Sequence, residues 1–151
     1  MKLKDYIGKY VPQINDEIKN LFDENTKEIK NEFLKNYYTE MKDYFLAGGK
    51  RIRPLLSIAT YNGFSETRDE KILRPSIGVE FLHNASLIHD DIIDNDDYRR
   101  GSPSFHYRYN QYHQNTKMNL LSPEEFGRDM GILGGDSAFF LGLQPLMYNQ
   151  F

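Results

Sequence analysis

Apolar side chains recur every three or four positions over residues 3–22, which is the spacing of a helix with one buried face. Pro12 interrupts this pattern, and because proline suits the first turn of a helix, we expect a helix to begin there. A second segment with helical spacing starts near Thr26. We expect it to end at Gly48-Gly49, since glycine readily adopts the left-handed conformation that stops a helix.

Two further helices are predicted in the middle of the chain. Pro54 fits the first turn of a short helix that closes at Asn62-Gly63. Residues 75–93 form the longest segment with helical spacing, and most of its apolar positions should be buried.

The last third of the chain has a different character. Residues 101–125 contain many tyrosines, asparagines and glutamines and are predicted to form a loop. Ser122-Pro123-Glu124-Glu125 is typical of a helix start and precedes a last helix over residues 130–143. Since no useful alternating pattern indicates strands, the sequence predicts one all-α helical bundle over residues 1–151.

The composition mainly excludes classes of protein. The 151 residues hold 19 Lys and Arg against 22 Asp and Glu, so a general nucleic-acid binder, which carries a basic excess, is not expected. The absence of cysteine excludes a disulfide framework, a thiolate zinc site and a thiol nucleophile. No apolar run approaches the length of a membrane span, and the charged start is not a secretory signal. We therefore expect no membrane span and a cytoplasmic location.

Three aspartates lie at the C-terminal end of the long helix predicted over residues 75–93. Asp90 and Asp94 are one turn apart and face the same way, with Asp91 beside them. Like charges at this spacing repel, so the arrangement costs stability unless a cation lies between them. Mg²⁺ suits such oxygen ligands because it retains water and bridges to substrate phosphates. A solvated acidic helix end is the alternative for such a pair taken alone.

Basic residues surround the aspartates in sequence and on the helix. His83 falls on the same helical face as Asp90, and Arg99-Arg100 follow, offering forked donors that match phosphate oxygens. A second basic group, in the string GGKRIRP, places Lys50 and Arg53 at a glycine turn just before a helix. A basic loop after a glycine cap is the alternative there. Together the two basic groups indicate two phosphorylated substrates.

Three strings in this order carry a family resemblance: GGKRIRP, HNASLIHDDIIDNDDYRRGSPSFH and ILGGDSAFF. They resemble the N-terminal half of the trans-polyprenyl diphosphate synthases, the family that elongates isoprenyl chains. The match is dense over residues 48–106 and resumes over residues 131–141. The resemblance implies the N-terminal half of the isoprenoid synthase fold and a prenyltransferase that condenses isopentenyl diphosphate with an allylic diphosphate.

The resemblance also implies a role for each motif residue. Asp90 and Asp94 would hold Mg²⁺, or Mn²⁺ as the alternative, on the allylic diphosphate, and Asp91 would support this catalytic cluster. Arg99 would contact the allylic diphosphate. Isopentenyl diphosphate would be bound by Lys50, Arg53, His83 and Arg100.

Product length in this family is controlled by side chains one turn before the aspartates. Here those positions hold Ala85 and Ser86, which are small. An aromatic side chain there would close the pocket near a C15 product, so the resemblance implies a product of C20 or longer. Alternatively, small residues at these positions simply permit close helix packing.

Two departures from the family pattern limit these expectations. The segment from Tyr107 to Arg128 is long and polar, which suggests a mobile flap or an insertion. The family's second aspartate-rich motif has no counterpart before Phe151. We therefore expect residues 1–151 to be a partial synthase domain that is inactive or nearly so alone. Family members are usually homodimers, and the same is expected here.

Two other functions stay open from the sequence. An HD-type metal phosphohydrolase would use His89-Asp90, but it needs another histidine on an earlier helix, and none precedes His83. A non-catalytic homologue or partner subunit would bind diphosphate without turnover. The missing second motif favours the latter, whereas the intact first motif and both basic groups favour an enzyme.

Overall fold

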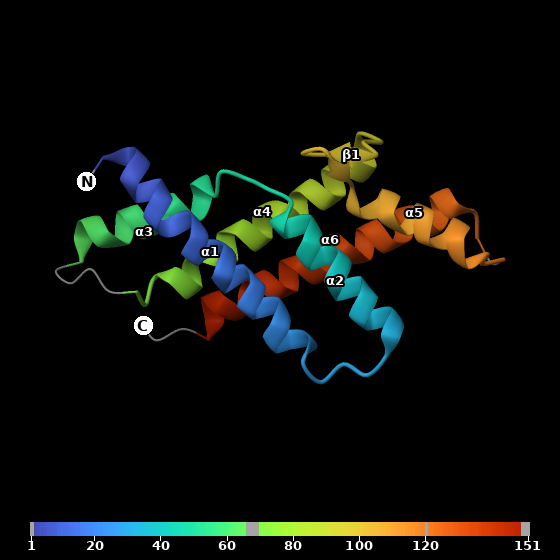
Figure 1. Ribbon diagram of the computed structural model, residues 1–151, viewed down its shortest axis with the longest axis horizontal. Helices are drawn as coiled ribbons and strands as arrows, with labels where there is room; N and C mark the ends of the chain where they lie inside the picture. Colours follow the sequence, from blue (N-terminus) through green and yellow to red (C-terminus); the bar gives the residue numbers. More distant parts are fainter. Residues whose placement is uncertain (1, 66–69, 120, 149–151) are drawn as a thin grey trace.

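The computed structural model describes residues 2–65, 70–119 and 121–148. Within them the chain forms six helices and one short hairpin (Figure 1). The hairpin pairs β1 (Tyr98–Arg99) with β2 (Ser102–Pro103). The helices are α1 (Leu3–Thr26), α2 (Glu32–Leu46), α3 (Ile52–Phe64), α4 (Leu73–Ile93), α5 (Phe105–Thr116) and α6 (Pro123–Met147). The predicted all-α class is therefore confirmed.

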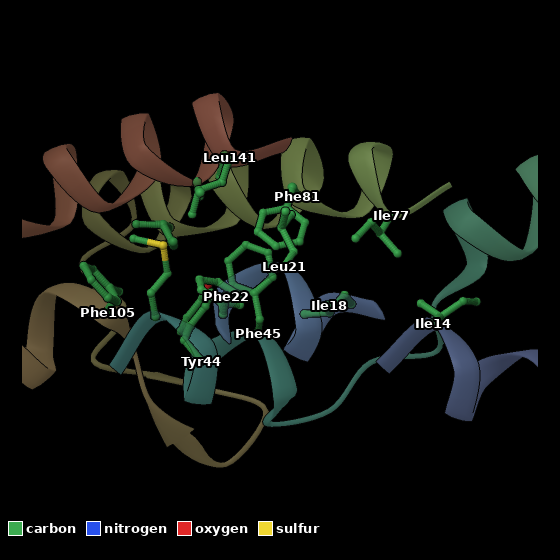
Figure 2. Packing of buried hydrophobic residues seen from close by; sticks show 14 of the residues in the cluster. Ile14, Ile18, Leu21, Phe22, Tyr44, Phe45, Ile77, Phe81, Phe105 and Leu141 are labelled. Carbon is green, nitrogen blue, oxygen red and sulfur yellow. The ribbon is translucent and has the colours of Figure 1, made fainter. Parts of the chain in front are cut away.

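The helices form two layers around one apolar core. α4 and α6 lie side by side along the long axis of the molecule (Figure 1), and the apolar side chains of α1 and α2 face them (Figure 2). The centre of this contact is an aromatic cluster of Phe22, Phe45 and Phe81, with ring centroids 4.5 to 5.3 Å apart. Each of these rings comes from a different helix, so the cluster fixes α1 and α2 against α4.

Glycines allow α6 to approach its neighbours closely. A Cβ atom on Gly142 would lie 2.6 Å from Phe81 Cβ, and one on Gly78 would lie 2.9 Å from the Gly142 carbonyl oxygen. Farther along α6, a Cβ atom on Gly134 would lie 2.3 Å from the Phe105 ring. Because real Cβ atoms do not approach so closely, larger residues would force α6 away from α4 and α5. The close contact holds α4, which carries the aspartates, in a fixed place.

Several predicted boundaries are confirmed. The long helix expected over residues 75–93 corresponds to α4, and Pro54 lies in the first turn of α3. The start predicted at Ser122 forms a capping box, in which the Ser122 hydroxyl accepts a hydrogen bond from the Glu125 N–H and the Glu125 carboxylate accepts one from the Ser122 N–H.

The loop predicted over residues 101–125 is wrong for residues 105–116, which form α5. α5 occupies half of that segment, with Phe105, Tyr109 and His113 buried at steps of four. Tyr37 of α2 packs edge-on against Phe105, with ring centroids 5.6 Å apart. The many polar residues between these positions obscure the amphipathic pattern in the sequence, because α5 buries only these three side chains.

Two helix starts were also wrong. Pro12 lies inside α1 and starts no helix, since the buried Tyr10 and Ile14 on either side hold the helix in place although proline donates no hydrogen bond. α2 starts at Glu32 and not near Thr26, which is the last residue of α1. The Asn31 side chain accepts a hydrogen bond from the Leu34 N–H at 3.0 Å and so defines the start of α2.

Candidate active site

The exposed aspartates lie at the C-terminal end of α4. Asp90 is in its last turn, and Asp94 is the capping residue, whose N–H donates to the Asp90 carbonyl oxygen at 2.8 Å. Both are exposed, and neither carboxylate has a hydrogen bond or ion pair with any residue that the structure describes. Residues four apart on a helix have Cβ atoms only about 6 Å apart. The two carboxylates are thus close together and available to a ligand.

Asp91 differs from these two because it is completely buried. Its Oδ2 accepts a hydrogen bond from the Tyr44 hydroxyl at 2.9 Å, and its Oδ1 accepts one from the Arg99 Nε–H. Burial raises the pKa of the Asp91 carboxyl, while the hydrogen bonds from Arg99 and Tyr44 oppose this shift. Both carboxylate oxygens of Asp91 already accept hydrogen bonds, so Asp91 is not placed as a metal ligand.

The hairpin between β1 and β2 places the two arginines. Arg99 pairs with Ser102, and the turn between them puts Arg100 and Gly101 at φ values of 54° and 78°. Such positive φ values suit the tight turn of a two-residue hairpin. Because of this turn, the two neighbouring arginines have different partners. Arg99 Nε donates a hydrogen bond to Asp91, and Arg100 Nη1 donates one to the Gly48 carbonyl oxygen at 2.6 Å.

A pocket of about 610 Å³ brings together residues from both basic groups predicted from the sequence. It is lined by residues of the 48–53 loop, by two residues of α4 and by Arg100. Among its lining residues are all four that the resemblance assigns to isopentenyl diphosphate: Lys50, Arg53, His83 and Arg100. Three cationic side chains beside an imidazole give this pocket the chemistry that suits an anion, and it is called the anion pocket below.

The protonation state of the His83 imidazole depends on its surroundings. Burial lowers the pKa of its imidazole, and the positive charge of Arg53 lowers it further. At neutral pH the ring is therefore neutral, and it offers the pocket a hydrogen bond and no additional charge.

A buried ion pair supports the loop that carries Lys50 and Arg53. Arg51 adopts a left-handed conformation with φ of 52°, and its Nη1 lies 2.9 Å from Glu80 Oε1. Its Nε donates to Asn15 Oδ1 at 2.8 Å, and its Nη2 donates to the Phe45 carbonyl oxygen at 2.7 Å. The side chain of Arg51 therefore points into the protein, whereas Lys50 and Arg53 stay exposed in the pocket.

The two residues assigned to product length are not brought together. Ser86 is exposed one turn before Asp90 on the same face of α4, and its hydroxyl donates to the His83 carbonyl oxygen at 2.7 Å. Ala85 is buried in the core. Only Ser86 therefore faces the region of the aspartates.

The carboxylates at the end of α4 are the candidate ligands for a metal ion. No group of three or more histidine, cysteine, aspartate or glutamate side chains converges in the described part of the chain. Asp90 and Asp94 nevertheless fit Mg²⁺, which takes one or two protein carboxylates and completes its coordination with water and substrate phosphates. They are hard oxygen ligands without other partners among the described residues.

Three residues of the site were not identified from the sequence. Tyr44 and Glu80 contact the motifs from 47 and 29 positions away, and Arg51 lies inside GGKRIRP but was not singled out. One signal was available for Glu80, because an acidic residue in an apolar helix segment needs a cationic partner.

Residues 35–149 match the sequence profile of the family described as polyprenyl synthetase. The chain belongs to the polyprenyl synthetase family. A short chain isoprenyl diphosphate synthase of Methanocaldococcus jannaschii is 44% identical over an alignment of 123 residues that covers 77% of this chain and 32% of the relative. A geranylgeranyl diphosphate synthase of Saccharolobus solfataricus is 35% identical over 131 residues, 87% of this chain and 32% of the relative.

Solved structures of this family share the fold. The crystal structure of geranylgeranyl pyrophosphate synthase from Corynebacterium glutamicum, complexed with isoprenyl diphosphate and magnesium, has a TM-score of 0.81 and 28% sequence identity. The similarity covers 97% of this chain and 42% of that one. The chain spans about a third of the length of the curated relatives it matches.

Membership in the polyprenyl synthetase family removes the phosphohydrolase alternative. His89 Nε2 lies 3.1 Å from the Ile132 carbonyl oxygen on α6, and no second imidazole joins it to form a metal-binding group within the described residues.

None of the helices in the described ranges is long and apolar enough to cross a membrane.

Proposed function

We propose that this chain supplies the diphosphate-binding part of a prenyltransferase that joins isopentenyl diphosphate to an allylic diphosphate. The observation that carries the proposal is the convergence of Lys50, Arg53, His83 and Arg100 in one pocket. His83 lies seven residues before Asp90 on α4, about 10 Å along the helix axis. The anion pocket and the paired carboxylates therefore share one rigid helix.

Isopentenyl diphosphate occupies the pocket in this proposal. Lys50 and Arg53 come from the loop and first turn of α3, and Arg100 comes from the hairpin. Their charges neutralise the diphosphate from two sides, while the neutral His83 donates or accepts a hydrogen bond without repelling the arginines. The pocket thus holds a substrate that keeps its diphosphate through the reaction.

In this proposal the allylic diphosphate lies at the C-terminal end of α4, against Asp90, Asp94 and Arg99. Mg²⁺, when bound to the two carboxylates, would neutralise charge that develops on the leaving diphosphate. Arg99 adds a fixed positive charge at the same place, and its side chain is 26% exposed. Leu87 lies between His83 and Asp90 on α4 and supplies half-buried apolar surface between the two diphosphates.

The family resemblance implies the reaction that this arrangement of charge would serve. The allylic carbon–oxygen bond breaks, and the diphosphate leaves with the electron pair. The double bond of isopentenyl diphosphate then attacks the allylic cation and forms the new carbon–carbon bond. Loss of one proton restores a double bond, which leaves a longer allylic diphosphate and free diphosphate.

A product of C20 or longer is part of the proposal. Support comes from the small, exposed Ser86 one turn before Asp90, where a bulky side chain would stand beside the growing chain. Ala85 is buried, so we assign it no direct contact with the product in this chain.

We also propose that the 151-residue chain binds its ligands but turns them over little or not at all when alone. The support is its span of about a third of its curated relatives, together with one aspartate-rich motif in its sequence. Binding of diphosphate without turnover is therefore the second candidate function. A homodimer and a cytoplasmic location stay predictions.

One pair of experiments tests the proposal. Calorimetry on the 151-residue chain should detect binding of isopentenyl diphosphate, and binding of geranyl diphosphate that depends on Mg²⁺. A prenyl-transfer assay with labelled isopentenyl diphosphate, geranyl diphosphate and Mg²⁺ should then give little or no elongated product. Elongation would contradict the proposed inactivity, and its product length would test the C20 assignment. A chain that binds neither diphosphate would overturn the proposed function.

A further inference from the structure

The guanidinium of Arg99 is held by one edge only. Its Nε donates to the buried Asp91, and no residue in the described ranges makes a hydrogen bond with Nη1 or Nη2. An arginine bound through Nε keeps both terminal nitrogens for a second, bidentate partner. The position of this free edge depends on where the Asp91 carboxylate lies.

Tyr44 determines the position of that carboxylate from the other side. Its hydroxyl is the donor to Asp91 Oδ2 at 2.9 Å, and the tyrosine is itself buried. The ring cannot easily turn, because it packs edge-on against Phe105 with ring centroids 6.4 Å apart. α2 thus contributes a fixed hydroxyl beneath the aspartate motif of α4.

Without this hydroxyl, Asp91 Oδ2 would be a buried acceptor with no donor among the described residues. An unpaired buried acceptor of this kind is destabilised by its desolvation, which favours rotation of the carboxyl towards another donor. Rotation of the carboxyl alters the bond to Arg99. The effect of Tyr44 therefore reaches the exposed face of the site through two hydrogen bonds.

We infer that Tyr44 is a positioning residue for the allylic diphosphate, acting through Asp91 on the free edge of Arg99. The inference rests on the proposed function, in which Arg99 contacts that diphosphate. Tyr44 itself touches no substrate, and the isopentenyl diphosphate pocket does not include it.

The test measures two affinities in Tyr44→Phe. With Mg²⁺ present, the affinity for geranyl diphosphate should fall about fivefold, as expected for loss of one buried hydrogen bond. The affinity for isopentenyl diphosphate should stay unchanged. Tyr37→Phe is the matched control, since Tyr37 is also a buried tyrosine of α2 and its hydroxyl lies 2.9 Å from Ser137 Oγ, away from the motif. It should leave both affinities unchanged.

A double-mutant cycle separates positioning from a merely structural role. If Tyr44 acts through Arg99, then Tyr44→Phe should have no further effect on geranyl diphosphate affinity in an Arg99→Gln background. An equal fivefold loss in that background would overturn the inference. So would an unchanged affinity of Tyr44→Phe when Arg99→Gln alone weakens binding.

A spectroscopic measurement needs no ligand and covers the case in which the variant is destabilised. In ¹⁵N NMR spectra the Arg99 Nε–H should be protected from solvent exchange in the parent and in Tyr37→Phe, and less protected in Tyr44→Phe. Equal protection in all three would overturn the inference. Failure of the parent chain to bind geranyl diphosphate would instead overturn the proposed function, and the inference with it.

Discussion

Arg51 Nη1 lies 2.9 Å from Glu80 Oε1, and the two side chains are only 1% and 3% exposed. The ion pair connects the loop before α3 to the middle of α4, and Asn84 adds a hydrogen bond from its Nδ2 to Glu80 Oε1 at 3.3 Å. Both residues lie at the wall of the anion pocket, but their side chains are almost completely covered. The pair therefore fixes the wall from which Lys50 and Arg53 extend.

Removing one charge of this pair should destabilise the fold. Glu80→Gln leaves the buried Arg51 without a counter-charge, and we expect the free energy of unfolding to fall by about 3 kcal/mol. Urea denaturation followed by circular dichroism measures this. The control is Glu17→Gln, because Glu17 pairs with Arg74 where both side chains are partly exposed and should cost no more than about 1 kcal/mol. Equal effects in the two variants would contradict the assignment.

Neutralising the exposed cations should affect binding and not folding. Lys50→Gln or Arg53→Gln should weaken binding of isopentenyl diphosphate about tenfold in the absence of Mg²⁺, as expected for loss of a charged hydrogen bond. Lys42→Gln serves as the control, since Lys42 pairs with Asp23 outside the pocket. Calorimetry and thermal melting on the same samples separate the two effects. Unchanged affinity in both pocket variants would contradict the role of the pocket.

Glycine substitutions test the close contact between α4 and α6. Gly142→Ala would place a Cβ atom 2.6 Å from Phe81 Cβ and 3.2 Å from the Gly78 carbonyl oxygen, so the helices must separate. We expect a loss of about 1 to 3 kcal/mol in unfolding free energy. Gly8→Ala in α1 meets no atom within 4 Å and should instead gain roughly 0.5 to 1 kcal/mol. A neutral Gly142→Ala would show that the helices tolerate a larger spacing.

Stability should fall as the pH drops below about 7. Burial lowers the pKa of His106, although Asp97 at 3.7 Å opposes the shift. Below the ordinary value of 6.5 the unfolded chain takes up a proton that the folded chain resists, so the free energy of unfolding decreases towards the lower folded pKa. His83 acts with the same sign.

The measurement is the melting temperature of the parent and of His106→Gln between pH 7.5 and 5.5. The variant should lose part of the pH dependence. Asp91, whose pKa burial raises, acts with the opposite sign and is present in both proteins. Identical pH profiles would contradict the role of His106.

Sequence reasoning succeeded where the determining interactions are local. Asp90 and Asp94 are one turn apart in any helix, so their shared face follows from spacing alone. The capping box at Ser122 and Glu125 is likewise contained in four residues. The motifs also contain Lys50, Arg53, His83 and Arg100, which the loops and the hairpin bring into one pocket, and the role assigned to these residues stays a prediction.

The remaining features depend on tertiary contacts. The different environment of Asp91 is created by Tyr44, which is 47 positions away in the sequence and has no local pattern that marks it. α5 was missed because its tyrosines, asparagines and glutamines hide the spacing of Phe105 and Tyr109, which are buried only when α2 and α6 pack against them. A local pattern cannot contain such partners.

The central claim is that Asp90 and Asp94 bind a metal together with a diphosphate. Its most direct test is calorimetric titration of geranyl diphosphate into the parent chain, Asp90→Asn and Asp94→Asn, with and without Mg²⁺. Asp43→Asn, at an exposed position of α2, is the control. We expect Mg²⁺ to tighten binding about tenfold or more in the parent and control, and to have little effect in the two motif variants. The same enhancement by Mg²⁺ in all four proteins would contradict the claim.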